Sequence, residues 1–136
     1  MTDPNRPMRA AVIGLGMMGR AHVRVWDELV DGVELVAVAD SDPAALRQAT
    51  QGRAARGYSD AAALLAAEQP DLVSVVVPTS IHLSTALAAL EAGAHVLVEK
   101  PIAATRGEAE EMIGAARRAG RMLTVGHIER FNPAIR

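Results

Sequence analysis

The sequence of 136 residues contains no cysteine, and its only aromatic residues are Trp26, Tyr58 and Phe131. The absence of cysteine excludes disulfides, thiolate metal sites and cysteine nucleophiles. Three rings are too few for a platform that stacks single-stranded nucleic acid, and a net charge of −2 gives no attraction to nucleic acid or anionic membranes. No apolar run approaches the ~18 residues of a membrane span. Residues 1–7 are polar with two prolines, unlike a signal peptide, so we expect a disordered tail and one soluble, cytoplasmic domain.

Lysine is almost absent, because the sequence has thirteen arginines and a single lysine, Lys100. Arginine stays protonated at physiological pH, whereas the pKa of lysine falls on burial, so lysine can take part in proton transfer. Lys100 follows residues 95–99, which are predicted as a strand with an apolar centre. We therefore predict a chemical role for Lys100. The alternative is that one lysine survived by chance in an arginine-biased composition.

What the sequence does contain is a glycine-rich segment, Gly14-Leu15-Gly16-Met17-Met18-Gly19. An apolar run with β-branched members, residues 9–13, precedes it, as expected of a buried strand. Apolar residues recur at helical spacing after it, over residues 20–29. Asp40 ends a second apolar run, residues 35–39, twenty-one residues beyond the last glycine. Strand, glycine loop, helix and acidic residue together make up the dinucleotide-binding pattern.

Each part of this pattern has a physical role. Gly14 permits a tight turn, Gly16 lets backbone N–H groups approach a pyrophosphate, and Gly19 lets helix and strand pack closely. The helix N-terminus brings partial positive charge to the phosphates, and the Asp40 carboxylate can accept both ribose hydroxyl protons. Serine and aspartate follow Asp40, with no arginine beside it, so we predict NAD rather than the negatively charged 2′-phosphate of NADP. The alternative is a glycine-rich turn that binds nothing, which leaves the acidic residue unexplained.

The rest of the chain alternates predicted strands and helices. Helices are expected over residues 43–51 with Asp42 as N-cap, over 60–68 with Ser59 as N-cap, from Ser80 to Gly93, and after a capping box at 105–108. Strands are expected over residues 54–58, 72–77, 95–99 and 122–126. The alternation predicts an α/β fold, a Rossmann-type doubly wound parallel sheet in three αβα layers with strand order 3-2-1-4-5-6. Ligands bind at the carboxyl ends of such strands, where Gly14, Asp40, Pro78, Glu99 and His127 would converge.

Four segments resemble the Gfo/Idh/MocA oxidoreductases in order and spacing. They are Gly14 to Gly19 with His22, Pro78-Thr79-Ser80-Ile81-His82, Glu99-Lys100-Pro101, and Gly126 to Pro133. The resemblance runs from about Arg9 to the end of the chain, and the Glu-Lys-Pro element is its specific part. The glycine string also resembles that of the β-hydroxyacid dehydrogenases, which lack Glu-Lys-Pro at this distance.

The resemblance implies NAD as cofactor. From the residues themselves, we expect no metal site, because no short spacing puts two histidines on one helix face and no cysteine accompanies them. At the pyrophosphate, the implied contacts are Gly14, Gly16, Gly19 and the backbone of Met17 and Met18. Asp40 would contact the adenosine ribose, and Pro78, Thr79 and His82 would line the dinucleotide. Glu99 and Lys100 would lie by the nicotinamide ribose, with His127 at the rim of the pocket. Lys100 is also the implied catalytic residue, and its peptide bond to Pro101 is a candidate for the cis form. From the residues themselves, we expect His22 to pack or bond locally and His95 to be structural.

The resemblance further implies transfer of hydride between NAD and a hydroxyl of a sugar, nucleotide sugar or cyclitol. Lys100 would lower the pKa of that hydroxyl and hold it while another base takes the proton. Family members continue into a substrate domain, so we expect residues 8–127 to form the dinucleotide-binding domain and 128–136 to begin a missing one. The excised chain should bind NAD without turnover. The alternatives are a stand-alone NAD-binding regulatory module and a small fold that has lost its ligand.

The C-terminal segment carries a further expectation. Ile128, Phe131 and Ile135 recur at helical spacing, so this segment should present an apolar face with no cover of its own. An exposed apolar face at a terminus frays or finds a partner. We therefore expect residues 128–136 to be poorly ordered or packed against a second copy. The sequence over residues 127–133 is most similar to the nucleotide-sugar 3-dehydrogenase branch of the family.

Overall fold

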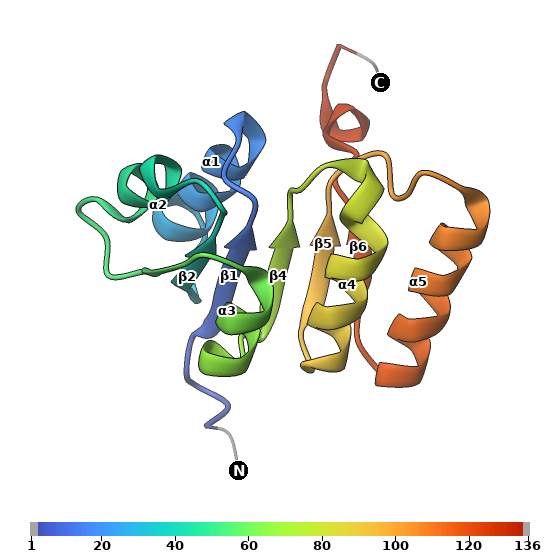
Figure 1. Cartoon of the computed structure of the whole chain (residues 1–136), viewed down its shortest axis with the longest axis horizontal. Coiled ribbons are helices and arrows are strands. Elements are labelled where there is room, and N and C mark those ends of the chain that lie inside the picture. Colours follow the sequence, from blue (N-terminus) through green and yellow to red (C-terminus); the bar gives the residue numbers. More distant parts are fainter. Residues whose placement is uncertain (1–2, 135–136) are drawn as a thin grey trace.

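The structure, a computed structural model, describes residues 3–134. Its six strands are β1 (Met8–Ile13), β2 (Val33–Ala39), β3 (Arg56–Tyr58), β4 (Leu72–Val75), β5 (His95–Val98) and β6 (Leu123–Val125). They form one parallel sheet in the order β3-β2-β1-β4-β5-β6, which confirms the predicted order. All strands point to the same edge of the sheet (Figure 1), and the order reverses between β1 and β4. A doubly wound sheet binds its ligands at this edge and at this reversal.

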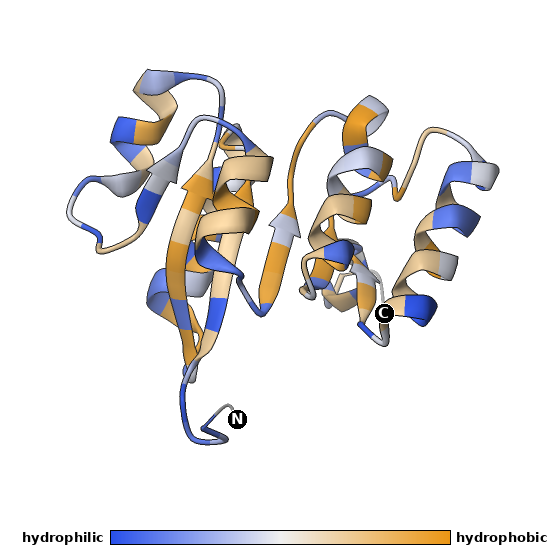
Figure 2. Ribbon diagram, turned by 60° about the horizontal axis from the view of Figure 1, so that its bottom comes forward, coloured by the Kyte–Doolittle hydropathy of each residue, from blue (hydrophilic) through white to orange (hydrophobic). Residues whose placement is uncertain are grey.

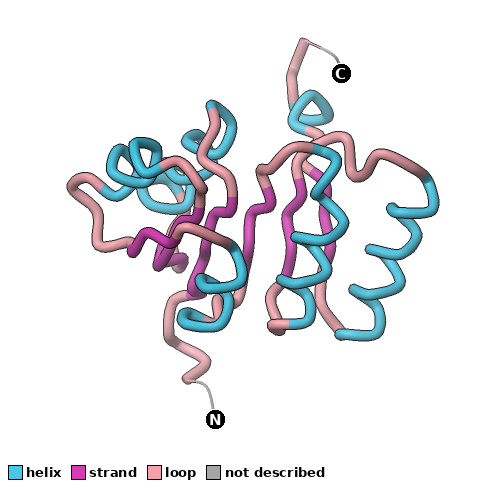
Figure 3. The backbone as a smooth tube through the Cα atoms, viewed as in Figure 1, coloured by secondary structure: helices cyan, strands magenta, loops and turns pink. Residues whose placement is uncertain are grey.

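Helices cover both faces of the sheet. They are α1 (Met17–Arg24) with its π-helical continuation η1 (Val25–Leu29), α2 (Pro43–Thr50), α3 (Ala61–Glu68), α4 (His82–Glu91) and α5 (Arg106–Ala119), with short 3-10 turns η2 (Thr79–Ile81) and η3 (Ile128–Phe131). The helices α3, α4 and α5 lie on one face, and α1 and α2 lie on the other (Figures 1 and 3), so the three predicted layers are confirmed. Within residues 3–134, no helix is both long enough and apolar enough to span a bilayer.

Each face of the sheet has its own apolar core. On one face, Leu64, Leu90 and Met112 of α3, α4 and α5 pack against the strands. On the other face, Val12 and Val38 of the central strands pack under α1 and α2. Because both faces of the central strands are buried, their sequences are almost continuously apolar rather than alternating (Figure 2).

Helix ends with a clear local signal follow the prediction. The Asp42 carboxylate caps α2 by accepting from the Ala44 N–H at 2.9 Å, and Pro43 occupies the first helical position. The capping box of α5 is complete, because Thr105 Oγ1 accepts from the Glu108 N–H and the Glu108 carboxylate accepts from the Thr105 N–H. These bonds satisfy backbone donors that the first helical turn leaves without partners.

Several predicted boundaries are wrong. The N-cap of α3 is Asp60, whose carboxylate accepts from the Ala63 N–H at 2.8 Å, and not Ser59. The helix expected from Ser80 begins at His82, because the residues just before it form the tighter 3-10 turn η2. The first helix starts at Met17, earlier than the glycine loop suggested. Strands β3 to β6 are shorter than predicted, because residues at their ends leave the ladder for the connecting loops.

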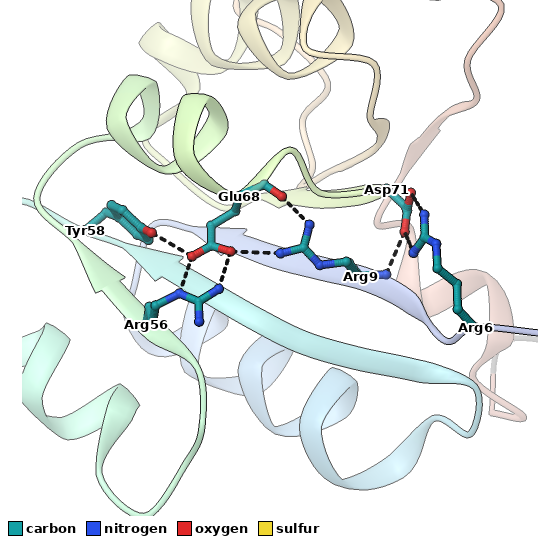
Figure 4. A network of polar contacts seen from close by, with 6 residues as sticks. All are labelled: Arg6, Arg9, Arg56, Tyr58, Glu68 and Asp71. Carbon is teal, nitrogen blue, oxygen red and sulfur yellow. Dashed lines mark hydrogen bonds and ion pairs between the residues drawn. The ribbon is translucent and has the colours of Figure 1, made fainter. Parts of the chain in front are cut away.

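A network of hydrogen bonds and ion pairs lies near the amino ends of the strands, away from the carboxyl edge of the sheet (Figure 4). The Glu68 side chain at the end of α3 is only 2% exposed. It accepts hydrogen bonds from Arg9 of β1 at 2.8 Å, from Arg56 of β3 at 2.6 Å, and from the Tyr58 hydroxyl at 2.6 Å. These bonds, that of Arg56 first, lower the pKa of Glu68 to about 2. The network thus ties α3 to β1 and β3 through one buried carboxylate.

A second ion pair extends the network to the N-terminal segment. Arg6 donates to both oxygens of Asp71, at 2.7 and 2.8 Å, and the Arg9 N–H donates to the same carboxylate at 2.8 Å. The Arg6 guanidinium holds the pKa of Asp71 below its usual range. Residues 3–7, which we expected within a disordered tail, therefore form a turn anchored just before β4. Residues 1 and 2 lie outside the described range.

Candidate functional site

The segments that follow the strands at the carboxyl edge of the sheet carry every residue that was assigned to a site from the sequence. They are Gly14, Gly16, Met17, Met18 and Gly19 after β1, Asp40 after β2, Pro78, Thr79 and His82 after β4, Glu99 and Lys100 after β5, and His127 after β6. Within residues 3–134, no group of three or more His, Asp or Glu side chains could hold a metal ion.

Two adjoining cavities form a single groove along this edge. One, of about 430 Å³, is lined by Asp40 and the glycine loop, and the other, of about 530 Å³, by Thr79, Glu99, Lys100 and the start of α1. Both cavities are lined by Gly16, Val76, Val77 and Pro78, so they are continuous with each other. The groove therefore connects the Asp40 loop to the Glu99–Lys100 loop across the reversal of strand order.

The three glycines of the loop differ in whether the protein leaves room for a side chain. A Cβ on Gly14, whose φ is +98°, would lie 2.1 Å from the carbonyl oxygen of Val76. A Cβ on Gly19 would lie 1.9 Å from the carbonyl oxygen of Gly14. At Gly16, no atom lies within 4 Å of the position that a Cβ would take. The fold requires the first and third glycines, whereas the space at Gly16 is open for a ligand to approach the backbone.

Helix α1 begins at this open space without a side-chain cap. Gly16 is its N-cap and supplies no side-chain acceptor, and its first turn contains no acidic residue. Met17 and Met18 follow, both exposed and both lining the groove. An N-terminus that lacks an internal cap leaves its N–H groups to bind an anion, since they carry partial positive charge.

The Asp40 carboxylate is oriented by two backbone donors. One oxygen accepts from the Leu15 N–H of the glycine loop at 2.8 Å, and the other accepts from the Asp42 N–H at 2.8 Å. Each oxygen keeps a lone pair, so the side chain can still accept two hydroxyl hydrogens in the groove. This arrangement matches a ribose diol.

At the other end of the groove, Glu99 is buried and Lys100 is exposed. The Glu99 carboxylate accepts a hydrogen bond from the backbone N–H of Lys100 at 3.1 Å. The Lys100–Pro101 peptide bond is cis, as predicted. A Cβ on Gly126 would lie 2.9 Å from a Glu99 oxygen, so the glycine after β6 makes room for this carboxylate.

His82 lines the groove but is buried, and its ring nitrogens are engaged by backbone carbonyls. Nδ1 bonds the oxygens of Pro101 and Ile102 at 2.9 and 3.2 Å, and Nε2 bonds the oxygen of Val77 at 2.8 Å. The side chain therefore joins the loop after β4 to the loop after β5. Its contribution to the groove is to hold these two loops together.

His127 lies beside the groove rather than along it. It lines an adjoining apolar hollow of about 420 Å³ together with Trp26 and Phe131. Met18, Glu99 and Ile128 line both this hollow and the groove, so the two meet at these residues.

The contacts of His22 were not predicted from the sequence. Its partners are not local, because Nδ1 bonds Ser74 Oγ at 2.9 Å and Nε2 bonds Glu99 Oε1 at 2.8 Å. The expectation of local packing was therefore wrong. His22 lies three residues after Gly19, whose missing side chain brings α1 against the glycine loop. Residues three apart lie on the same side of a helix, so His22 faces the sheet as Gly19 does. This spacing was the signal in the sequence that could have predicted the contacts of His22.

Comparison with known proteins agrees with this geometry. A family model described as an oxidoreductase family with an NAD-binding Rossmann fold (Gfo/Idh/MocA) matches residues 8–127. D-apiose dehydrogenase of Paraburkholderia graminis is 40% identical over 135 residues, which are 98% of this chain and 36% of that protein. UDP-N-acetylglucosamine 3-dehydrogenase of Acidithiobacillus ferrooxidans is 37% identical over 128 residues, 94% of this chain and 39% of that protein.

Solved structures give the same result. The WlbA dehydrogenase from Bordetella pertussis, determined in complex with NADH and UDP-GlcNAcA, is 30% identical with a TM-score of 0.89, over 96% of this chain and 38% of that one. The chain thus spans less than two fifths of the length of these relatives. The family match covers most of the described fold, including the glycine loop and the Glu99–Lys100 loop. The chain belongs to the Gfo/Idh/MocA oxidoreductases and carries their NAD-binding Rossmann fold.

Proposed function

We propose that this chain is the cofactor-binding part of a dehydrogenase that transfers hydride between NAD and a hydroxyl-bearing carbon of a sugar, nucleotide sugar or cyclitol. The observation that carries the proposal is the open space at Gly16, beside the uncapped start of α1 and the Asp40 carboxylate. A diphosphate and a ribose match these groups. The dehydrogenases of D-apiose and of UDP-N-acetylglucosamine among the relatives support the substrate class.

In this proposal, the two ends of the groove hold the two ends of NAD. The backbone of Gly14, Gly16 and Gly19 and the N–H groups of Met17 and Met18 surround the diphosphate. Asp40 accepts from the adenosine ribose, while Pro78 and Thr79 line the path and His82 holds that path in place. Glu99 accepts from the second ribose, and His127 lies at the rim.

The proposed catalytic group of this chain is the Lys100 ammonium. NAD, when bound, supplies the acceptor of the hydride. Lys100 lies next to Glu99 in the groove, where its ammonium can donate a hydrogen bond to the substrate hydroxyl and stabilise the alkoxide as the hydride leaves. The base that takes the hydroxyl proton and the walls that hold the substrate are assigned to the longer sequence of the relatives, beyond residues 8–127. Residues 128–136 would begin that second part.

Isothermal titration calorimetry of the chain with NAD and NADP tests the proposal. Two like charges ~4 Å apart repel by about 4 kcal/mol at an effective dielectric constant near 20, so NAD should bind at least about tenfold more tightly than NADP. Asp40→Asn should narrow this difference. Asp31→Asn, an exposed aspartate in the turn before β2, is the matched control and should leave it unchanged.

Tighter binding of NADP, or no binding of either nucleotide, would contradict the proposal. Incubation with NAD and sugars should give no turnover, because the substrate walls and the base belong to the other part. Oxidation of a sugar by these 136 residues would instead assign the complete activity to this chain. An isolated NAD-binding regulatory module would bind NAD equally well, and assays of a longer form of the chain distinguish it from the dehydrogenase.

Two further expectations remain proposals. The C-terminal segment, in which Ile128 and Phe131 are exposed, is proposed to mediate self-association of the chain. A cytoplasmic location, which we expect from the sequence, also stays a prediction.

A further inference from the structure

A line of four side chains runs beside the apolar hollow, from α1 and η1 to the end of β5. Trp26 Nε1 donates to Ser74 Oγ at 2.8 Å. Ser74 Oγ bonds His22 Nδ1 at 2.9 Å, and His22 Nε2 bonds Glu99 Oε1 at 2.8 Å. We refer to Trp26, Ser74, His22 and Glu99 as the His22 relay. Ser74 is fully buried at the centre of the sheet, and the side chains of His22 and Glu99 are nearly so.

The chemistry of these groups fixes the direction of the relay. The indole N–H of Trp26 can only donate, so Ser74 Oγ accepts there. An ionised Glu99 carboxylate can only accept, so the His22 ring carries a hydrogen on Nε2 and donates it to Glu99. The opposite tautomer would set the Nε2 lone pair against a carboxylate. No buried side-chain nitrogen or oxygen in the described part of the chain lacks a partner, and this direction uses each group of the relay once.

Glu99 needs such a donor because of where its carboxylate lies. It lies where the groove and the apolar hollow meet, and Gly126 leaves space beside it. The Lys100 N–H holds only one of its oxygens. The His22 ring, which lines the hollow, holds the other oxygen through its Nε2–H, so both oxygens are fixed and the carboxylate keeps one orientation. Each oxygen retains one lone pair for a donor in the groove.

We propose that His22 is a positioning residue for the cofactor. Its Nε2–H fixes the Glu99 carboxylate so that the carboxylate accepts from the ribose hydroxyls at the Lys100 end of the groove. This inference rests on the proposed function. It does not involve the Asp40 end, so its effect should be confined to the half of the cofactor that ADP lacks.

A pair of His22 variants separates this role from simple packing. The amide nitrogen of glutamine takes the place of Nε2, whereas the amide of asparagine takes the place of Nδ1 and does not reach Glu99. His22→Asn should weaken binding of NADH by about tenfold, the effect of losing one hydrogen bond to a charged group, and should leave ADP binding unchanged. His22→Gln should restore NADH binding. His95→Asn, at the opposite edge of the sheet, is the control and should match the unaltered chain.

Titration calorimetry with NADH and ADP distinguishes the outcomes. If the unaltered chain binds neither nucleotide, the proposed function is overturned and this inference with it. If the chain binds both, the inference alone is overturned when His22→Asn weakens NADH and ADP equally, when it weakens neither, or when His22→Gln fails to restore NADH binding.

Nitrogen-15 NMR of the unaltered chain gives a measurement that needs no variant. The His22 ring should show a protonated Nε2, which donates to Glu99. A hydrogen on Nδ1 and none on Nε2 would overturn the inference even if His22→Asn failed to fold.

Discussion

At the level of single residues, the glycine loop offers a test that separates folding from binding. Gly14→Ala should destabilise the chain by at least about 2 kcal/mol, because a side chain at φ +98° is strained and collides with the Val76 carbonyl. Gly16→Ala should cost less than about 1 kcal/mol, because its backbone is extended and its surroundings are open. The same substitution should weaken NAD binding by at least about tenfold.

Thermal unfolding and calorimetry of the two variants provide the measurement. The decisive comparison is between the loss of stability and the loss of NAD affinity in each variant. Gly32→Ala, at a turn far from the groove, is the control. Full NAD affinity in Gly16→Ala would remove the main support for the proposed function. A normal melting temperature in Gly14→Ala would show that the loop can rearrange around a side chain.

At the level of elements, α3 is tied to β1 and β3 by the buried Glu68 carboxylate. Glu68→Gln should lower the free energy of unfolding at pH 7 by about 2–3 kcal/mol. This is below the cost of breaking a fully buried pair, because Arg56 is 63% exposed and solvent screens part of the attraction. The pKa of Glu68 falls from an ordinary 4.5 to about 2 in the folded state. Its contribution is therefore complete above about pH 4.5 and is lost as the pH falls towards 2.

Urea unfolding at pH 7 and pH 3 tests this expectation. The difference in stability between the unaltered chain and Glu68→Gln should shrink at the lower pH, whereas Glu111→Gln, an exposed glutamate on α5, should cost little at either pH. A difference that stays constant between the two pH values would mean that the Glu68 charge does not stabilise the fold.

The elements also show how far sequence reasoning reaches. The strand order and the caps at Asp42 and Thr105 were predictable, because hydrophobic periodicity and capping are local signals. The partners of His22 were not, since Ser74 and Glu99 lie 52 and 77 residues away and meet it only after the sheet has formed. The same holds for the carbonyls around His82, which come from two loops. Motifs located the edge of the site, and tertiary contacts decided which side chains face it.

For the whole molecule, the apolar surface near the C-terminal segment predicts self-association. Phe131 is 70% exposed and Ile128 is 54% exposed, and both border the apolar hollow. The expected continuous helical face is only partly testable, because η3 ends at Phe131 and Ile135 lies outside the described residues. Exposed apolar patches of this kind favour association. Sedimentation velocity should show a concentration-dependent dimer that Phe131→Ser weakens, because burial of such a ring stabilises contact by about 1.5–3 kcal/mol.

Met122→Ser is the matched control, since Met122 is also exposed but does not line the hollow. It should leave the dimer unaffected. If the chain stays monomeric at high concentration, the expected self-association is wrong. If Phe131→Ser and Met122→Ser weaken the dimer equally, the dimer contact does not lie at the hollow.

The open space at Gly16 has a consequence for the history of such chains. Gly14 and Gly19 are constrained by neighbouring backbone, so any descendant with this fold must keep them, whatever it binds. At Gly16, no neighbouring atom of the described chain stands in the way of a side chain, and under the proposed function only the bound nucleotide does. A descendant that gave up its nucleotide would be free to acquire a side chain at this one position while keeping the same sheet and helices. Drift at the middle glycine, with the outer two retained, would then date the loss of the cofactor among related sequences.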